Sequence, residues 1–134
     1  MTLKQKLHAK CMELMDEKLA FLQNALLDLA QGAQNDSKSS AGDKHETARA
    51  MMQIEQEKLG RQLAEAKVMK SELERVNPEI VNQQVGKGSL VKTNLGYLYI
   101  SVGLGKIVVD TNSIMTLSAE SPLGKQLLFR KNVN

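Results

Sequence analysis

The stretch SSAGDKHETA, residues 39–48, lies between two long segments whose apolar residues recur every three or four positions, the spacing of an amphipathic helix. The first stripe runs through residues 3–33 and is broken by Gly32 and the polar run that follows it. The second runs through residues 48–76 and ends at Asn77-Pro78, because the residue before a proline avoids helical angles. Each helix alone would expose its stripe, so we expect the chain to reverse near residue 40 and pack the stripes together.

We therefore predict a long antiparallel helical hairpin, packed as a coiled coil, over residues 1–77. Each arm has about 30 residues and would be about 45 Å long at a rise of about 1.5 Å per residue. The polar and acidic residues near 36–47 would form the tip of this hairpin.

Residues 78–134 change to short runs rich in Val, Ile, Leu, Tyr and Thr, separated by Gly and Asn. This pattern favours a small antiparallel sheet of three or four strands, in which Gly103 and Gly105 would belong to a hairpin turn. Ser121-Pro122 is typical of a helix start, with Ser as the N-cap and Pro at the first position, and predicts a short helix over SPLGKQLL. The sequence thus predicts an α+β protein, a helical hairpin followed by a β-rich C-terminal domain.

The net charge of +3 comes entirely from residues 77–134, which hold six Lys or Arg against three acidic residues. This mild positive field suits an acidic protein surface, and it is too weak to predict sequence-specific DNA binding. Cys11 is the only cysteine, which excludes an intrachain disulfide, and no apolar run approaches the roughly 20 residues that span a bilayer. The N-terminus lacks the features of a signal peptide, so we expect a cytoplasmic protein that has no membrane partner.

Asp43 and Glu46 lie three residues apart at the expected turn, and two interpretations of the pair stay open. In the first they form a variant of the capping box, in which Asp43 caps the second helix and Glu46 reaches back. In the second they are an incomplete site for a hard cation such as Mg²⁺, which commonly keeps other positions for water or substrate phosphates. The two interpretations are compatible, because a capping carboxylate can still offer an oxygen lone pair.

The order of helix, acidic turn, helix and small β-rich domain resembles that of the bacterial Gre transcript-cleavage factors, which carry G-D-x-x-E-N-x-E-Y at the tip. GDKHETARA, residues 42–50, stands in that place here. SPLGKQLL is similar to the family's S-P-I-A-R-A-L-I segment, the preceding IMTLSAE to its strand, and VGKGSL (85–90) to its V-x-F-G-S-x-V strand start. The resemblance covers most of the chain in order, and it implies a reduced form of the FK506-binding-protein (FKBP-like) fold for residues 78–134.

The resemblance also implies the function of a bacterial transcription elongation factor. In that family the hairpin enters the secondary channel of RNA polymerase, where the tip acids help to bind a Mg²⁺ ion and orient water against a backtracked transcript. Asp43 and Glu46 match the family's two functional acids, and would act as catalytic and Mg²⁺-binding residues near the 3′ end of the transcript. The chain would not be an enzyme alone and would carry no cofactor of its own, since the polymerase shares the metal.

Three positions depart from the family's tip motif: Thr47 replaces its Asn, Arg49 its second Glu and Ala50 its Tyr. Arg49 places a positive charge one helical turn from the acids, which would weaken cation binding. The family's C-terminal domain also continues with strands beyond the segment that SPLGKQLL resembles. One alternative is therefore a non-catalytic channel binder that competes with cleavage factors, and another is a coiled-coil adaptor protein, with the oligomeric state open in each case.

Other residues allow two interpretations. His45, inside the acidic turn, is either a third metal ligand or a solvated loop residue, and the second is the simpler. Cys11 lies on the apolar stripe and is expected to be a buried thiol rather than a nucleophile. The basic residues of the last third form either a docking face or an ordinary solvated surface: Lys87, Lys92, Lys106, Lys125, Arg130 and Lys131.

Overall fold

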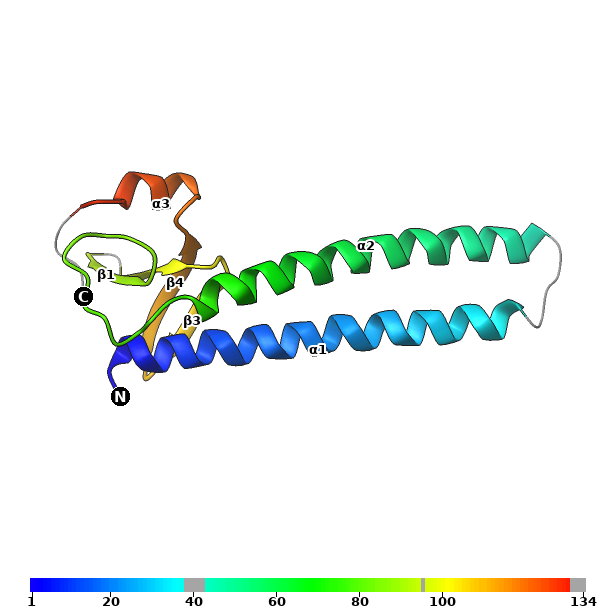
Figure 1. The fold of residues 1–134 in the computed structure, drawn as a ribbon, viewed down its shortest axis with the longest axis horizontal. Coiled ribbons are helices and arrows are strands. Elements are labelled where there is room, and N and C mark those ends of the chain that lie inside the picture. The colour runs from blue at the N-terminus through cyan, green and yellow to red at the C-terminus, as the bar shows by residue number, and fades with distance from the viewer. Residues whose placement is uncertain (38–42, 95, 131–134) are drawn as a thin grey trace. The chain divides into compact units, whose positions relative to one another are not determined.

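The computed structural model describes residues 1–37, 43–94 and 96–130, and in residues 33–37 and 43–45 it describes the backbone alone. Two long helices are followed by four strands and a short helix, which confirms the predicted α+β class and order of elements (Figure 1). The elements are α1 (Leu3–Ser37), α2 (Asp43–Glu74), β1 (Ser89–Thr93), β2 (Gly96–Ser101), β3 (Gly105–Val109), β4 (Asn112–Ser118) and α3 (Pro122–Leu127). Neither long helix holds a stretch apolar enough to cross a membrane, as far as the structure describes them.

The chain divides into two compact units, and the boundary between them crosses both long helices. The hairpin unit is Met15–Val68, which contains most of α1 and α2. The sheet unit is Met1–Leu14 together with Met69–Asn134, so the first turns of α1 and the last turn of α2 belong with the strands.

In the hairpin unit, α1 and α2 run side by side in opposite directions (Figure 1). The Met52 Cε atom lies 3.4 Å from the position that a Cβ on Gly32 would occupy, which brings the end of α1 beside the start of α2. Met15, Leu22 and Ala66 are buried, and all three belong to the predicted stripes. The predicted reversal near residue 40 is confirmed, whereas packing of the coiled-coil type stays a prediction.

The four strands form one sheet in the order β1-β2-β4-β3, and one of its pairings corrects the prediction. β1 pairs with β2, and β3 with β4, antiparallel as expected, but β2 pairs with β4 in parallel. The chain therefore does not form a hairpin at Gly103 and Gly105, because β3 does not pair with β2 and β4 lies between the two strands. The hairpin lies one turn later, at Asp110 and Thr111, whose φ angles of 49° and 68° are those of a type I′ turn.

The two faces of the sheet bury different side chains. On one face the start of α1 approaches β2, where the His8 Nδ1 and Tyr99 Oη atoms are 3.1 Å apart. The other face packs Ile100 and Leu117 into a cluster with Val85, against which Leu127 of α3 lies. Both faces are thus covered over at least part of their area.

The start of α3 follows the predicted pattern. Ser121 is the N-cap, its Oγ atom accepts a hydrogen bond of 3.0 Å from the Gly124 N–H, and Pro122 is the first helical residue. Gly124 is buried so tightly that a Cβ would collide with the carbonyl oxygen of Ser118. The short helix predicted over SPLGKQLL is confirmed, while the likeness of the whole domain to the FK506-binding-protein fold stays a prediction.

Candidate functional site

The acidic turn opens the second arm of the hairpin unit. Asp43 is the first residue of α2, and Glu46 follows three residues later as an exposed side chain of the first turn. Positions three apart on a helix lie on one face with their Cβ atoms about 5–6 Å apart, so positions 43 and 46 belong to one side of α2. The side chains of Asp43 and His45 lie outside the described part of the structure, so the capping box and the third ligand stay predictions.

The electrostatics at this place suit anionic side chains. The N-terminus of a long helix carries a partial positive charge of about half an elementary charge, which stabilises carboxylates in the first turn. Two carboxylates alone leave most positions of a bound Mg²⁺ to other ligands, because the ion prefers six oxygens in octahedral geometry. Among the described residues no group of three His, Cys, Asp or Glu side chains is arranged to hold a metal ion, and Asp43 and His45 are outside that comparison.

Arg49 is the feature of the turn that opposes cation binding. It is exposed and lies three residues after Glu46, on the same side of α2 and one turn further along. An exposed charge at this distance is largely screened by water, so its repulsion of a bound cation is modest. The Glu46 carboxylate can therefore still bind a cation in the presence of Arg49.

The two units carry net charges of opposite sign. The hairpin unit holds seven Lys or Arg against nine acidic residues, a net charge of −2, and the sheet unit holds eleven against six, a net charge of +5. These values add to the +3 of the whole chain. The acidic turn thus lies in the unit of net negative charge, and the excess of basic residues lies in the other unit.

The structure does not gather the six basic residues of the last third into one face. Lys92 on β1 lies opposite Tyr97 on β2, and its Nζ atom is 6.0 Å from the centre of the Tyr97 ring. Lys106 on β3 lies opposite Met115 on β4. Met115 pairs with Leu98, the residue after Tyr97, and successive residues of a strand face opposite sides of the sheet. Lys92 and Lys106 therefore point to opposite sides. Arg130 Nε donates a hydrogen bond of 2.9 Å to the Gln126 carbonyl, and Lys131 lies outside the described residues.

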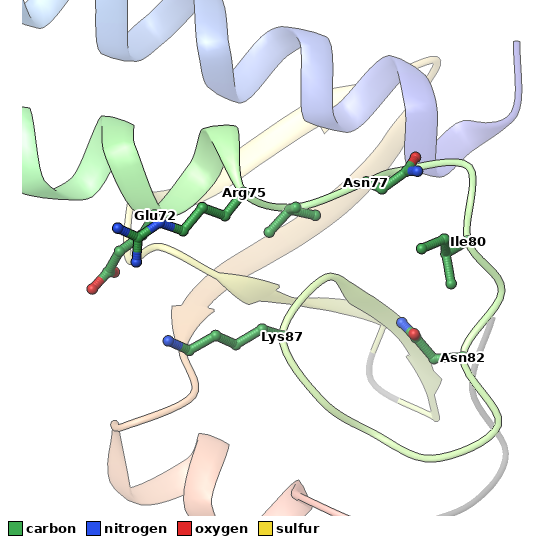
Figure 2. Close-up of a pocket in the computed structure, with 7 residues that line it drawn as sticks. Glu72, Arg75, Asn77, Ile80, Asn82 and Lys87 are labelled. Carbon is green, nitrogen blue, oxygen red and sulfur yellow. The ribbon is translucent and has the colours of Figure 1, made fainter.

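A hollow of about 220 Å³ in the sheet unit is instead lined by two basic side chains, Arg75 and Lys87, which come from different segments of the chain. Figure 2 shows Arg75 and Lys87 extending in the same direction in that view, with Glu72 beside Arg75. Arg75 follows the end of α2, and Lys87 belongs to the GKGS loop before β1. No pattern in the sequence pairs these two segments, since their proximity depends on how the chain between them folds.

Cys11 is buried, as predicted, and its surroundings do not favour a nucleophile. Burial raises the pKa of the Cys11 thiol to about 11, which keeps it protonated near neutral pH. Burial also lowers the pKa of the neighbouring His8 imidazole and raises that of the Tyr99 hydroxyl. The three groups are thus held in their neutral forms, which suits a packed core better than catalysis.

The comparisons with known proteins add no family to this geometry. Neither the protein-family models, nor the curated proteins, nor the solved structures include a match to this chain.

Proposed function

We propose that this chain is a Gre-like transcription elongation factor, which enters the secondary channel of RNA polymerase and promotes cleavage of backtracked RNA. A single observation carries the proposal: the chain reverses between Ser37 and Asp43, so that α2 begins with one acid and exposes a second, Glu46, in its first turn. Two helices of 35 and 32 residues, about 50 Å each, give a slender element that a narrow channel can admit.

The role of the two acids follows from the chemistry of Mg²⁺. When bound, the ion supplies Lewis acidity that stabilises charge at phosphorus and lowers the pKa of a coordinated water. Asp43 and Glu46 would donate oxygen ligands from one side of α2, while the polymerase and the transcript near its 3′ end would donate the others. On its own the chain would be inactive, because its two carboxylates do not complete a metal site.

The test is cleavage of RNA in purified, backtracked elongation complexes. The variant Asp43→Asn, Glu46→Gln removes both negative charges and keeps the size of each side chain. We expect it to bind the polymerase and to stimulate cleavage at least about tenfold less than the wild type, a loss of about 1.4 kcal/mol of transition-state stabilisation. Equal cleavage by the two proteins would disprove the role of the acids, and absence of polymerase binding by the wild type would disprove the function as a whole.

A matched control is available further along the same helix. Glu55 and Glu57 are exposed acids of α2, distant in sequence from the turn. The variant Glu55→Gln, Glu57→Gln also removes two negative charges from the hairpin unit. It should therefore keep the cleavage activity, which separates a local effect at the turn from a general effect of charge on polymerase binding.

Arg49 favours a second function, a channel binder that lacks cleavage activity and competes with cleavage factors. Its exposed guanidinium group lies one turn from Glu46 on the same side of α2. In this case the wild type would bind the polymerase, give no Mg²⁺-dependent cleavage, and inhibit an active cleavage factor by competition. Cleavage by the wild type above the rate of the polymerase alone would exclude this alternative.

A third function, that of a coiled-coil adaptor, is favoured by apolar side chains on the outside of the hairpin unit. Phe21, Met51 and Ile54 are each about two-thirds exposed, and a helical surface of this kind can bury itself against another protein. Sedimentation separates this function from the first: a monomer that binds polymerase argues against an adaptor, and a stable oligomer without polymerase affinity argues for one.

A further inference from the structure

A second hollow, of about 320 Å³, lies beside the start of α1 within the sheet unit. Its size falls at the lower end of the range for sites that bind small molecules. Ile80 and Val81, in the segment between α2 and β1, are mostly exposed although both are apolar. The apolar walls of this hollow, here named the α1 hollow, come from Leu3, Pro78, Ile80, Val81, Leu90 and Tyr97.

Lys4 is the polar group that makes the α1 hollow unusual. The side chain lines the hollow, and yet only 6% of the residue is exposed. Its Nζ atom donates a hydrogen bond of 2.7 Å to the Ile80 carbonyl, and no described carboxylate lies within ion-pair distance of it. An ammonium group has three N–H donors, and a buried charge normally pairs with an opposite charge, so this group has a neutral partner but no anionic one among the described residues.

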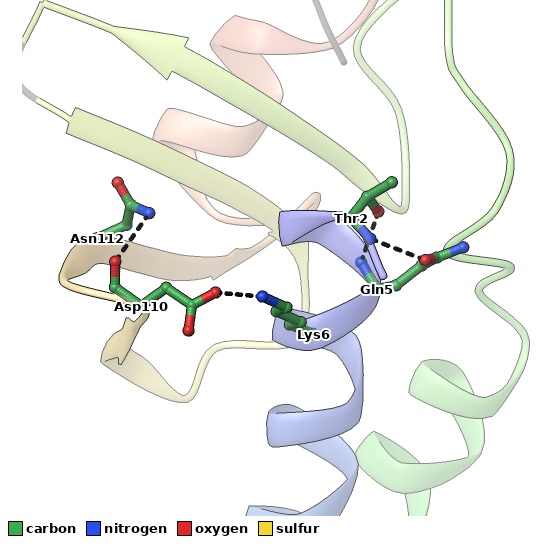
Figure 3. A network of polar contacts seen from close by, with 5 residues as sticks. All are labelled: Thr2, Gln5, Lys6, Asp110 and Asn112. Atoms are coloured by element: carbon green, nitrogen blue, oxygen red, sulfur yellow. Dashed lines mark hydrogen bonds and ion pairs between the residues drawn. The ribbon is translucent and has the colours of Figure 1, made fainter.

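The N-terminus of α1 adds positive potential at the same place. Thr2 and Gln5 form a reciprocal capping box: the Thr2 Oγ1 atom accepts from the Gln5 N–H at 3.2 Å, and the Gln5 Oε1 atom accepts from the Thr2 N–H at 2.9 Å (Figure 3). As in any α-helix, the first-turn N–H groups of Leu3 and Lys4 have no acceptor within the helix, whereas the Lys6 N–H donates to the Thr2 carbonyl. The free donors and the helix dipole both favour an anion here.

We propose that the α1 hollow binds a small apolar monocarboxylic acid, whose carboxylate pairs with the Lys4 ammonium group and whose hydrocarbon chain lies on the apolar walls. A single negative charge fits better than a phosphate or a dicarboxylate, because the exposed Glu79 also lines the hollow and repels additional negative charge. This site belongs to the sheet unit, and it does not depend on the function proposed for the acidic turn.

Calorimetric titration of the full chain with three six-carbon probes tests this proposal. Hexanoate carries the carboxylate, 1-hexanol has the same chain without charge, and hexylammonium has the opposite charge. We expect hexanoate to bind at least about tenfold more tightly than 1-hexanol at neutral pH, and hexylammonium not to bind. Equal binding of hexanoate and 1-hexanol, or absence of binding by hexanoate, would overturn the proposal.

The variant Lys4→Met identifies the group that recognises the carboxylate. It keeps the length and apolar contacts of the side chain but removes its charge, so the preference for hexanoate over 1-hexanol should disappear. Lys18→Met, an exposed position of α1 in the hairpin unit, makes the same change of charge and should keep the preference. An unchanged preference in the Lys4→Met protein would contradict the assignment.

A measurement on the unmodified chain makes the test independent of any effect of substitution on folding. Burial lowers the pKa of the Lys4 ammonium group, and a bound carboxylate would favour its charged form. NMR titration of the Lys4 side chain should therefore show that saturating hexanoate raises its pKa, while 1-hexanol does not. A Lys4 pKa that is equal with and without hexanoate would exclude the proposed ion pair.

Discussion

The hairpin unit and the sheet unit achieve order in different ways. Among the described residues, three apolar side chains are buried in the hairpin unit and thirteen in the sheet unit. Each helix of the hairpin unit buries a narrow stripe and exposes the rest, so the repeat of apolar residues along the chain suffices to specify it. The sheet unit buries side chains from many separate segments, so its structure depends on how those side chains fit together.

The units also differ in charge, with net charges of −2 and +5 for the hairpin unit and the sheet unit. A thin acidic element tolerates changes of its surface, because few of its side chains pack against a core. Because most of its side chains are exposed, the hairpin unit is also suited to presenting carboxylates to a partner. Substitutions should therefore affect stability mainly in the sheet unit and affect the proposed cleavage activity mainly at the acidic turn.

The largest expected difference between the units comes from truncating one leucine in each. Leu73 in the sheet unit is fully buried, and Leu27 in the hairpin unit is 57% exposed. Leu73→Ala should lower the free energy of unfolding by about 2–5 kcal/mol because it leaves a cavity, whereas Leu27→Ala should cost less than about 0.5 kcal/mol. Both tyrosines of the chain belong to the sheet unit, so tyrosine fluorescence during urea unfolding measures the stability of that unit. Far-ultraviolet circular dichroism, which reports mainly the long helices, measures that of the hairpin unit. Similar costs for the two substitutions would show that the units do not differ in packing as described.

A pair of glycines gives the next largest contrast, and here the effects should have opposite signs. Gly88 of the sheet unit has a φ angle of +89°, and a Cβ there would lie 2.9 Å from the Val76 Cγ1 atom. Gly88→Ala should therefore destabilise by about 1–3 kcal/mol, through backbone strain and crowding. Gly60, inside α2 in the hairpin unit, has open space around it, so Gly60→Ala should stabilise by about 0.5–1 kcal/mol.

Val76 offers a way to separate the two causes at Gly88. In the double variant Gly88→Ala, Val76→Ala the crowded methyl group is absent, so only the backbone strain and the loss of Val76 packing remain. If crowding contributes, Gly88→Ala should cost less in the Val76→Ala background than in the wild type, as measured by thermal unfolding. An equal cost in both backgrounds would assign the whole effect to the φ angle.

The contrast between the units also explains which predictions from the sequence succeeded. The helical repeat and the polar run after Gly32 predicted both long helices and the reversal between them, although α1 continues past Gly32 to Ser37, and the Ser121-Pro122 pair predicted the start of α3. These signals are local, since neighbouring residues determine them. The parallel pairing of β2 with β4 was missed, because each turn along the chain suggested a hairpin and the insertion of β4 depends on contacts far apart in the sequence.

The candidate sites divide in the same way. The sequence identified Asp43 and Glu46 from their spacing, and the structure places both in the first turn of α2. Lys4 was missed because a lysine near the N-terminus is usually exposed. A signal was nevertheless present: Lys4 precedes Leu7 by three residues and Cys11 by seven, the spacing of the apolar stripe, and all three are buried.

His8 and Tyr99 are within hydrogen-bond distance in the sheet unit, and the burial of His8 should make this unit sensitive to acid. Tyr99→Phe removes the hydroxyl group and should lower the free energy of unfolding by about 1 kcal/mol at neutral pH. Burial lowers the pKa of His8 in the folded state, while in the unfolded chain the pKa of His8 stays at about 6.5. The unfolded chain therefore binds the additional proton first, so the free energy of unfolding is unaffected by His8 above about pH 6.5 and decreases as the pH falls below that value.

Urea unfolding between pH 5 and pH 8, followed by tyrosine fluorescence, measures this dependence. His45 is the other histidine of the chain, so a His45→Gln background leaves His8 as the single titrating imidazole. Adding His8→Gln to that background should reduce the loss of stability between pH 6.5 and pH 5. The same pH dependence with and without His8 would show that carboxylates, rather than this imidazole, cause the loss.

The smallest effect is expected for the ion pair between Lys6 and Asp110, which joins α1 to the β3–β4 turn inside the sheet unit (Figure 3). The Lys6 Nζ and Asp110 Oδ2 atoms are 2.6 Å apart, but the two side chains are 43% and 58% exposed, so water and salt screen their attraction. Lys6→Met keeps the aliphatic part of the side chain. Asp110→Asn keeps a residue that tolerates the positive φ angle of 49°, so neither substitution disturbs the turn.

A double-mutant cycle of these two substitutions should give a coupling energy of about 0.2–1 kcal/mol at low salt, and less in about 1 M salt, where the Debye length is about 3 Å. A larger coupling that resists salt would mean that the pair is shielded from water and helps to hold the first turns of α1 on the sheet. In that case the charged groups, and not only the buried apolar side chains, would distinguish the sheet unit from the hairpin unit.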